Sequence, residues 1–554
     1  MICNMKKIFG LSIIALFMGL GLVSCDDWLD KLPDNRMELR TASDIKDLLV
    51  SAYAQNHPVY ILEMSSDNAD ECVNTGWTEY DRLQRQAFNW DDITEIGQND
   101  SPQSVWDAHY SAVAAANACI EHVDALPEEE KEAYAAQLGE ALICRAYAMF
   151  TLSTVFCEAY DPTTANQHLG LPYPTATETV VGQAYERGTL ADLYKMIDAD
   201  IQRGLPLVKN VYDKPKFHFT PDAANAFAAR FYLNYCDYNK VIEYASKVLG
   251  SNPYQVLRDW ESWAGLTLNQ QVAPEAYMQT SNRANLFEQV IYSSWGVVHG
   301  NYSSGCKYAH GNTISTYETL ESVGPWGESY HGQSTTYGLK YGIFINNSLS
   351  KRIMRKIPYE FEYTDLQARI GYAHSELVPF TTDILLLERA EAYALAGNLQ
   401  AAVDDVNTEL KAFAYAPFEL TVDSITKFYN KINYYVPYKT REEMALPNGR
   451  ELDYADYYTP KKHLSPKFIS LTEGSQQESV LQCILHLRRI LTIHEGMRFQ
   501  DIKRYGITIY RRTMDDQYYI TGINDTMDAN DPRHALQLPQ DVITAGLEAN
   551  PRNK

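Results

Sequence analysis

Residues 383–410, DILLLERAEAYALAGNLQAAVDDVNTEL, decide the fold of this chain. Apolar or small side chains recur at i, i+4, i+7, i+8 and i+11 in the first half, which places them on one face of a helix. Gly397 and Asn398 follow, and a second stripe of the same period runs from Leu399 to Leu410. A glycine directly after the last periodic residue is a common helix terminus. The stretch therefore predicts a helix, a glycine cap and a second, antiparallel helix.

Two earlier stretches repeat this pattern. One spans residues 224–249 with a turn at 237–239, and the other spans residues 106–152 with a break at Pro127. We expect helical hairpins at about residues 105–157, 222–250 and 383–412. Such units look like tetratricopeptide hairpins, each of which buries its apolar stripe against the next, although a loose helical bundle gives the same signal. The expected fold is mostly α, a tetratricopeptide-like scaffold with long loop-rich insertions at about residues 251–380 and 415–478.

The first 25 residues predict a lipoprotein signal. Lys6 and Lys7 precede an apolar run that ends in Leu22-Val23-Ser24-Cys25. A cationic start, a short apolar core and a small residue before the cut define a secretory signal, and a Cys at the cut resembles a bacterial lipobox. We expect residues 1–24 to be removed, Cys25 to carry lipid, residues 25–40 to form a tether and residues 41–554 to form one domain. A plain secretory signal or a signal anchor is the alternative.

Charge and cysteine usage narrow the function classes. The formal charge of −23 becomes −25 once Lys6 and Lys7 leave with the signal. An acidic surface without a basic run argues against nucleic acid and against anionic lipid as partners. Of nine cysteines, Cys3 is removed and Cys25 is lipidated, and the seven others are scattered without a CxxC pair. We expect them to be small buried hydrophobes, and we expect no metal site and no cofactor.

The order of segments resembles the SusD/RagB family of outer-membrane nutrient-binding lipoproteins over nearly the whole chain. The resemblance rests on Cys25, Leu29-Asp30, Trp106-x-x-x-Tyr110, Arg145-Ala146-Tyr147, Leu169-Gly170-Leu171-Pro172, residues 383–392 and, most specifically, Arg488-Arg489 with residues 494–506. It implies a helical scaffold anchored by lipid on the extracellular side of the outer membrane. It also implies a SusC-like TonB-dependent transporter as partner and a glycan, or in some members a peptide, as ligand. The acidic residues at 26, 27 and 30 resemble the export signal of surface lipoproteins in Bacteroidota.

Residues 494–506 are interpreted as architecture. We expect Glu495 to pair with Arg498, and Asp501 with Arg504, at i,i+3 on a helix that Gly506 caps. An arginine beside each acid would hold it ionised and occupied. We therefore expect these acids not to be catalytic, and the protein not to be an enzyme.

Aromatic residues predict the ligand-binding surface. The chain has 40 Tyr, and between residues 260 and 341 its aromatic residues are interleaved with Gly, Ser, Asn and His. Rings in such loops are poor core material and suit the flat C–H face of a pyranose, whose hydroxyls then reach amides or carboxylates. An earlier loop, at residues 67–90, is expected to meet the same face. The predicted ligand-binding residues are Asn74, Trp77, Trp263, Trp295, Tyr302, Trp326, Tyr330, Tyr337 and Tyr341. Packing of each ring under its own loop is the alternative.

Three hypotheses of function follow. The preferred one is a surface lipoprotein that captures oligo- or polysaccharide for an importer without chemistry of its own. The second is the same scaffold binding peptides, and the third is a secreted glycoside hydrolase, which needs two facing carboxylates. A tyrosine-rich stretch, residues 428–458, is expected to contact the transporter barrel or to extend the ligand surface; an insertion packed on itself is the alternative.

Overall fold

A computed structural model describes residues 41–72, 78–178, 180, 183–266, 272–299, 306–330, 338–346, 351–435, 460–515 and 520–552. The chain divides into two compact units, residues 1–48 and 49–554. Of the first unit, the described residues belong to the start of helix α3 (Ala42–Leu49) and the residue before it. Thr41 caps this helix, because its hydroxyl accepts a hydrogen bond from the Asp44 N–H at 3.2 Å and its own N–H donates to the Asp44 carboxylate at 2.7 Å.

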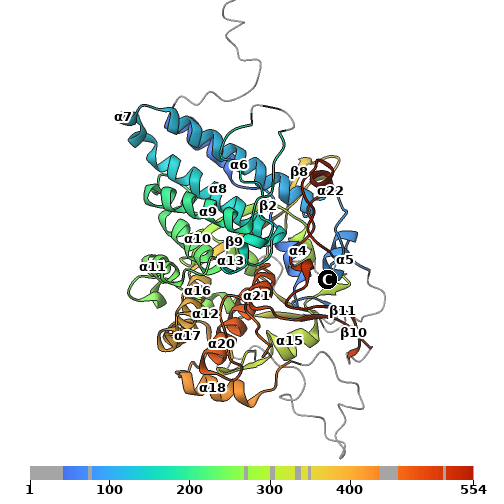
Figure 1. Cartoon of the computed structure of the whole chain (residues 1–554). Helices are drawn as coiled ribbons and strands as arrows, with labels where there is room; N and C mark the ends of the chain where they lie inside the picture. The colour runs from blue at the N-terminus through green and yellow to red at the C-terminus, as the bar shows by residue number, and fades with distance from the viewer. Residues whose placement is uncertain are drawn as a thin grey trace, which may run out of the picture. The chain divides into compact units, whose positions relative to one another are not determined.

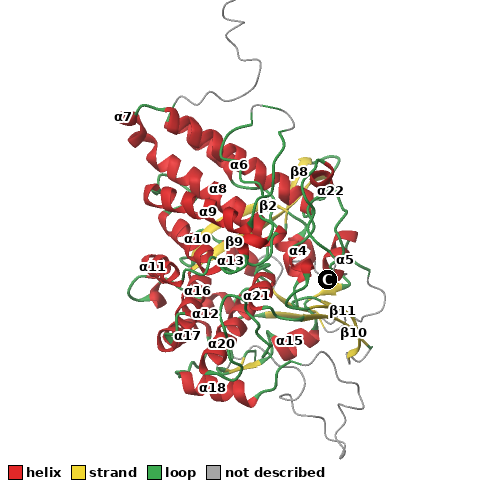
Figure 2. Ribbon diagram, viewed as in Figure 1, coloured by secondary structure: helices red, strands yellow, loops and turns green. Residues whose placement is uncertain are grey.

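The second unit is mostly helical, which confirms the expected fold class (Figures 1 and 2). Its α-helices are α4 (Val59–Ser65), α5 (Arg82–Asn89), α6 (Pro102–Ala125), α7 (Glu128–Lys131), α8 (Ala135–Phe156), α9 (Leu190–Gly204), α10 (Pro221–Asn234), α11 (Tyr238–Leu249), α12 (Trp260–Ala264), α13 (Val272–Met278), α14 (Trp295–His299), α15 (Asn312–Glu318), α16 (Thr382–Leu395), α17 (Leu399–Phe413), α18 (Val422–Lys431), α20 (Gln476–Leu491), α21 (Arg498–Tyr505) and α22 (Gln540–Thr544).

Helices pair into hairpins at the three places that the periodicity indicated: α6 with α8, α10 with α11, and α16 with α17. Local sequence sets their ends. The side chains of Thr220, Asp237, Thr381 and Asn398 each accept a hydrogen bond from a backbone N–H in the first turn of the helix that follows, which satisfies one of its free donors. Gly397 turns the chain between α16 and α17 with a φ of +83°, in the left-handed region.

The hairpins pack on one another and on two further long helices. Helix α8 contacts α6 and α9, α11 contacts α16, and α20 contacts α16 and α18. Two glycines allow the closest approach: a Cβ on Gly139 of α8 would lie 2.8 Å from Leu207, and one on Gly204 of α9 would lie 2.8 Å from the Leu142 Cβ. Each substituted residue would collide with a neighbouring element, so the packing of α8 depends on both glycines.

A buried ionic network joins α20 and α21 to α16. Arg488 pairs with Glu391 and, at 2.5 Å, with Asp501, while Arg504 pairs with Glu391 at 2.8 Å. All four side chains are buried. The expected i,i+3 pair of Asp501 with Arg504 is therefore wrong, because both residues find partners on other helices. Gly506 caps α21 in the left-handed conformation, as expected.

The second expected pair is also replaced by tertiary contacts. Glu495 pairs with Lys356 at 2.6 Å, and Arg498 pairs with Asp67 at 2.8 Å. Each partner lies more than a hundred residues away in sequence. Since a buried charge requires a partner, these bonds fix distant segments against the helical scaffold.

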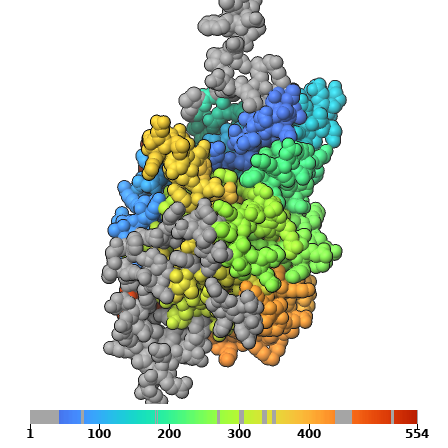
Figure 3. Space-filling model, turned by 180° about the vertical axis from the view of Figure 1, so that it is seen from behind, coloured from blue at the N-terminus to red at the C-terminus, as the bar shows by residue number. Residues whose placement is uncertain are grey.

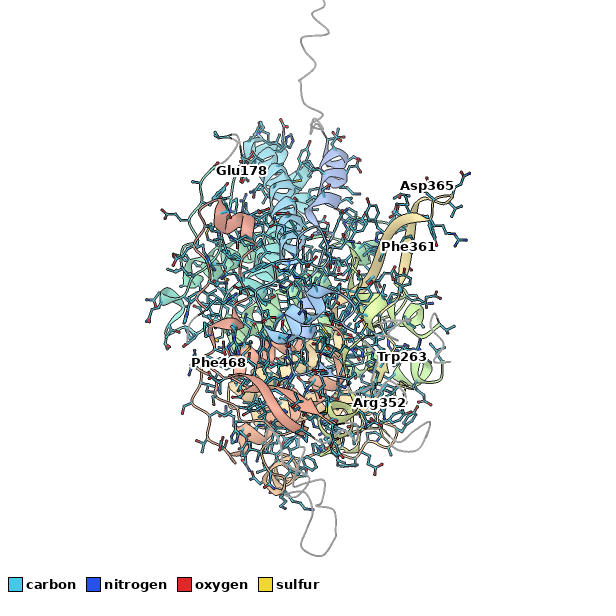
Figure 4. All side chains as sticks on the ribbon, turned by 90° about the vertical axis from the view of Figure 1, so that its right-hand side faces the viewer. Glu178, Trp263, Arg352, Phe361, Asp365 and Phe468 are labelled. Atoms are coloured by element: carbon cyan, nitrogen blue, oxygen red, sulfur yellow. The ribbon has the colours of Figure 1, made fainter. Side chains whose placement is uncertain are left out.

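The described strands form small antiparallel sheets. The largest has the order β2 (Asn285–Tyr292), β9 (Ile370–Thr381), β8 (Glu360–Asp365). Two-stranded sheets pair β1 (Asp70–Glu71) with β3 (Tyr308–Ala309), β4 (Val323–Gly324) with β5 (Gly327–Glu328), β6 (Ile343–Asn346) with β7 (Lys351–Met354), and β10 (Ile509–Met514) with β11 (Ile520–Met527). The hairpin of β8 and β9, with Phe361 and Asp365 on it, stands out from the body of the second unit (Figure 4).

The seven cysteines among the described residues are free, and six of them are buried, which agrees with their interpretation as small hydrophobes. Among the described residues, no helix combines the length and apolar character needed to cross a bilayer.

Candidate functional site

Four of the predicted ligand-binding rings belong to the core. The exposed fractions are 0% for Trp295, 4% for Tyr341, 6% for Trp263 and 8% for Trp326. The expectation that these rings are open stacking platforms is wrong. The polar, glycine-rich insertion folds into short helices and strands that cover them, so composition alone did not reveal their burial.

The protein itself satisfies the indole N–H of each buried tryptophan. Trp263 donates to the Ala273 carbonyl at 2.9 Å, Trp295 to the His494 carbonyl at 2.8 Å, and Trp326 to the Ser329 hydroxyl at 3.1 Å. Buried tryptophans usually find such a partner. These rings therefore fix the insertion to the scaffold, and Trp295 in particular joins α14 to the segment before α21.

Of the remaining predicted ligand-binding residues, the structure describes Tyr330 alone. Tyr330 is half-buried, and its ring stacks on that of Tyr341 with centroids 6.0 Å apart and an angle of 15°. Asn74, Trp77, Tyr302 and Tyr337 lie outside the described residues, so their assignment stays a prediction.

The two loops expected to share a face are joined by a pair of short strands. Asp70 lies opposite Ala309, and Glu71 lies opposite Tyr308. The Lys307 N–H donates to the Thr78 carbonyl at 2.9 Å. The described ends of both loops, at Cys72 and Thr78 on one segment and at Cys306 on the other, therefore meet at this junction.

Edge strand β8 carries exposed rings that the sequence analysis did not select. Phe361 and Tyr363 alternate with glutamates on β8, so their rings share one face of the ribbon, and Tyr359 continues the alternation directly before the strand. We name these three residues the aromatic track. Tyr363 is 51% exposed and the other two are half-buried. The rings of Phe361 and Tyr363 lie 4.9 Å apart, edge to face, and the hairpin that carries them reaches the surface (gold, upper left in Figure 3).

Small residues on β9 hold the track in place. Gly371 lies opposite Tyr363, and Ala373 lies opposite Phe361. A Cβ on Gly371 would meet the Phe361 ring at 2.8 Å and the Glu362 carbonyl oxygen at 1.9 Å. The Phe361 ring therefore lies over the glycine. This arrangement fixes the register of β8 against β9 and holds the ring in place before a ligand binds.

The base of the track lies beside the junction of the two loops. A Cβ on Gly296 of α14 would be 2.9 Å from the Tyr359 Cα, so α14 packs directly on this residue. Tyr80 is 42% exposed. Burial raises the pKa of Tyr80, a hydrogen bond with Ser294 lowers it, and Tyr359 is among the groups that raise it further. Tyr80 lies two residues after the described end of one loop and α14 ends where the other loop begins, so both segments connect the track to the described loop ends.

The opposite face of the ribbon combines rings with polar groups. Tyr372 is 52% exposed and meets Tyr292 edge to face at 5.7 Å. His374 lies 4.5 Å from Tyr292, and its Nε2 is 2.9 Å from a Glu362 carboxylate oxygen. Rings beside carboxylate and imidazole groups suit ligands that are flat and apolar on one side and carry hydroxyls on the other.

Charge on this sheet disfavours anionic ligands. Burial raises the pKa of Glu376 on β9 to about 7, and nearby Glu360, Glu288 and Glu275 add to the shift. The described residues contain no group of three or more His, Cys, Asp or Glu side chains placed to hold a metal ion. The clustered carboxylates of the sheet therefore suit a neutral ligand better than an anionic one.

Comparison with known proteins agrees with this architecture. Residues 27–233 match the profile of a SusD-like family described as starch-binding associating with outer membrane. A SusD superfamily protein from Bacteroides thetaiotaomicron is 16% identical, with a TM-score of 0.56 over 93% of this chain and 100% of its own. A putative sugar binding protein from Bacteroides vulgatus is 17% identical, with a TM-score of 0.57 over 93% and 99%. A SusD-like carbohydrate binding protein from the same species is 14% identical, with a TM-score of 0.59 over 91% and 96%. No curated protein matches the chain.

Proposed function

We propose that this chain, which belongs to the SusD/RagB family, captures oligo- or polysaccharide at the cell surface and delivers it to a SusC-like TonB-dependent transporter. The observation that carries the ligand class is the aromatic track, a row of preformed rings on an exposed ribbon. The family described as starch-binding and the sugar-binding neighbours support the same class of ligand. The proposal replaces the predicted tryptophan platforms with Tyr359, Phe361 and Tyr363.

The energetics favour capture over tight storage. Stacking of a sugar buries about 50–80 Å² of apolar area on each ring, and each contact contributes about 1–2 kcal/mol. Three rings together contribute about 3–6 kcal/mol, which corresponds to a dissociation constant from millimolar to tens of micromolar. A repeating polymer tolerates this weakness, because several units bind at once and many copies on a cell surface add avidity.

Binding without catalysis is part of the proposal. The two carboxylates that the sequence offered as a catalytic alternative, Glu495 and Asp501, are held in ion pairs with Lys356 and Arg488. A hydrolase needs an acid and a second carboxylate on opposite sides of one scissile bond. Neither of these two acids is available for that role. Incubation of each bound glycan with the protein is expected to release no new reducing ends.

Attachment by lipid at Cys25 completes the proposal. Acyl chains in the membrane would hold the protein at the outer surface, since two or three chains anchor almost permanently. Replacing Cys25 by Ser should move the protein from the membrane fraction to the medium, and protease added to intact cells should degrade the wild-type protein. Retention of Cys25→Ser in the membrane would contradict lipid anchoring.

Calorimetry against two panels tests the ligand class. The mature protein is titrated with soluble starch, xylan, mannan and host glycans, and separately with a tryptic peptide digest. Heat with at least one glycan and none with the digest is expected. Heat only with peptides would replace the glycan by the second hypothesis, the same scaffold binding peptides.

A further inference from the structure

An open hollow of about 460 Å³ lies between the tips of two helical hairpins. Its lining includes Tyr160, Tyr235, Asp237, Tyr238, Asn239 and Ala396. We name it the hairpin hollow. Its volume falls in the range of small-molecule sites, about 300–1,000 Å³. None of these residues is among the predicted ligand-binding residues or belongs to the aromatic track.

Three separate segments of the scaffold build the hollow. Tyr160 follows the end of α8, residues 235–237 form the turn between α10 and α11, Tyr238 and Asn239 begin α11, and Ala396 is the C-cap of α16. The turn contains Cys236 with a φ of +64°, a left-handed conformation that is uncommon for a residue other than glycine. The Asp237 N–H donates to the Tyr232 carbonyl at 3.0 Å and holds this turn closed. Rigid helix ends therefore position the wall of the hollow.

The tyrosine rings are braced from behind. Tyr160 stacks on Tyr194 with centroids 4.7 Å apart and meets Tyr235 edge to face at 4.9 Å. Tyr160, Tyr235 and Tyr238 are all half-buried. Tyr160 and Tyr235 are thus held by neighbouring rings and keep part of their surface open, as a stacking platform requires.

Polar groups lie beside these rings. The Asp237 side chain is 40% exposed while it caps α11, and Asn239 is exposed. The Asp237 carboxylate lies 3.8 Å from the Lys240 ammonium, so the mouth carries no excess positive charge to attract an anionic ligand to a chain of net charge −23. A wholly apolar ligand would desolvate the carboxylate and the amide without replacing their hydrogen bonds. Rings combined with a carboxylate and an amide instead suit a neutral sugar, whose hydroxyls donate to both oxygens.

From these observations we infer that the hairpin hollow is a second carbohydrate-contact site, an inference that rests on the proposed function. Helix α11 and strand β8 lie on different sides of the second unit in Figure 1, so the hollow and the track are separate. Short oligosaccharides then occupy the two independently. A polysaccharide chain gains avidity when different parts of it contact both.

Filling the hollow tests this inference. Ala396 is exposed at the end of α16, so Ala396→Trp blocks the hollow without removing a tyrosine. Gln400→Trp adds the same side chain on the exposed surface of α17, outside the lining. Affinity electrophoresis in gels of soluble starch, xylan or mannan measures retention. We expect Ala396→Trp to lower the apparent affinity about fivefold to thirtyfold, the loss of one stacked ring, and Gln400→Trp to behave as wild type.

A second variant removes only polar groups. Asp237→Asn keeps a good helix cap and removes the carboxylate, and Asn239→Ala removes the amide; the double variant should lose affinity in the same gels. A short oligosaccharide is then prepared from the glycan that retains the protein in the gel. Adding it should slow hydrogen exchange at residues 235–239 in the wild-type protein and leave exchange unchanged in Ala396→Trp.

The outcomes separate this inference from the proposed function. In one outcome the glycan retains the wild-type protein, Ala396→Trp and the Asp237→Asn/Asn239→Ala double variant equally, and the sugar does not change hydrogen exchange at residues 235–239. The hollow is then not a sugar site, whereas glycan capture by the protein stands. If no glycan of the panel retains the wild-type protein, the proposed function fails and the inference fails with it.

Discussion

Replacing Trp295 by Ala should destabilise the protein without removing a ligand contact. The side chain is 0% exposed, its ring lies 5.3 Å from that of Tyr60, and its N–H donates to the His494 carbonyl. Truncating a buried tryptophan costs about 3–5 kcal/mol, and the unpaired carbonyl adds about 1 kcal/mol. The expected loss of about 4–6 kcal/mol is a large part of the ~5–15 kcal/mol that stabilises a typical protein.

Urea unfolding followed by circular dichroism measures this loss. The midpoint of Trp295→Ala should fall while the slope m stays near the wild-type value. Tyr363→Ala is the matched comparison, because that ring is 51% exposed and surface substitutions usually change stability by no more than about 0.5 kcal/mol. If Trp295→Ala kept its stability within about 1 kcal/mol and lost glycan retention, the ring would be a platform and its assignment to the core would be refuted.

Two further predictions concern buried charge. Arg488→Met leaves the buried Asp501 carboxylate without the arginine it pairs with and removes one of the two arginines that pair with Glu391. It should cost about 3–5 kcal/mol in urea unfolding. Lys427→Met, which breaks a pair exposed at 75% and 69%, should cost under about 1 kcal/mol, and equal losses would contradict the network. Burial, with Asp383 beside it, raises the pKa of Glu409 well above 4.5, so folded Glu409 binds its proton more tightly than unfolded Glu409 does. The stability it contributes is therefore present at low pH and lost as pH rises through its folded pKa. Glu409→Gln should show a shallower fall of melting temperature from pH 5 upward, and parallel curves would exclude a protonated Glu409.

The hairpins could be predicted because their signals are local. Apolar spacing, the cap at Asp237 and the glycine at 397 all act within a few residues, and the structure has helices there. The ion pairs could not be predicted. Arg498 was assigned to Glu495 from helical spacing, but its partner is Asp67, 431 residues away, and no local pattern indicates such a contact.

The exposure of the aromatic side chains could not be predicted from the sequence either. Glycine-rich surroundings indicate open rings at Trp263 and Trp326, although both are buried and their indole N–H groups bond within the same insertion. The stretch Tyr-Glu-Phe-Glu-Tyr at 359–363 carries a clear two-residue alternation, which predicts a strand with one aromatic face. That signal was available in the sequence. Whether the face meets solvent or another sheet depends on tertiary packing, which alternation does not encode.

In the tyrosine-rich stretch, the described residues favour packing over an open ligand surface. Tyr429 is fully buried, with its hydroxyl 3.3 Å from the His486 Nδ1. The Tyr435 hydroxyl accepts a hydrogen bond from Arg512 at 2.9 Å. Residues 436–459 lie outside the described part, so contact of this stretch with a transporter stays a prediction.

Affinity electrophoresis of the double variant Phe361→Ala/Tyr363→Ala tests the central claim most directly. The matched control is Phe418→Ala, an aromatic residue that is 52% exposed and lies outside the track. If sugars stack on the track, the double variant should lose about 2–4 kcal/mol of binding, which is about 30-fold or more in affinity, with an unchanged circular dichroism spectrum, while Phe418→Ala keeps wild-type retention. Equal retention of the double variant, the control and the wild-type protein would contradict capture by the aromatic track.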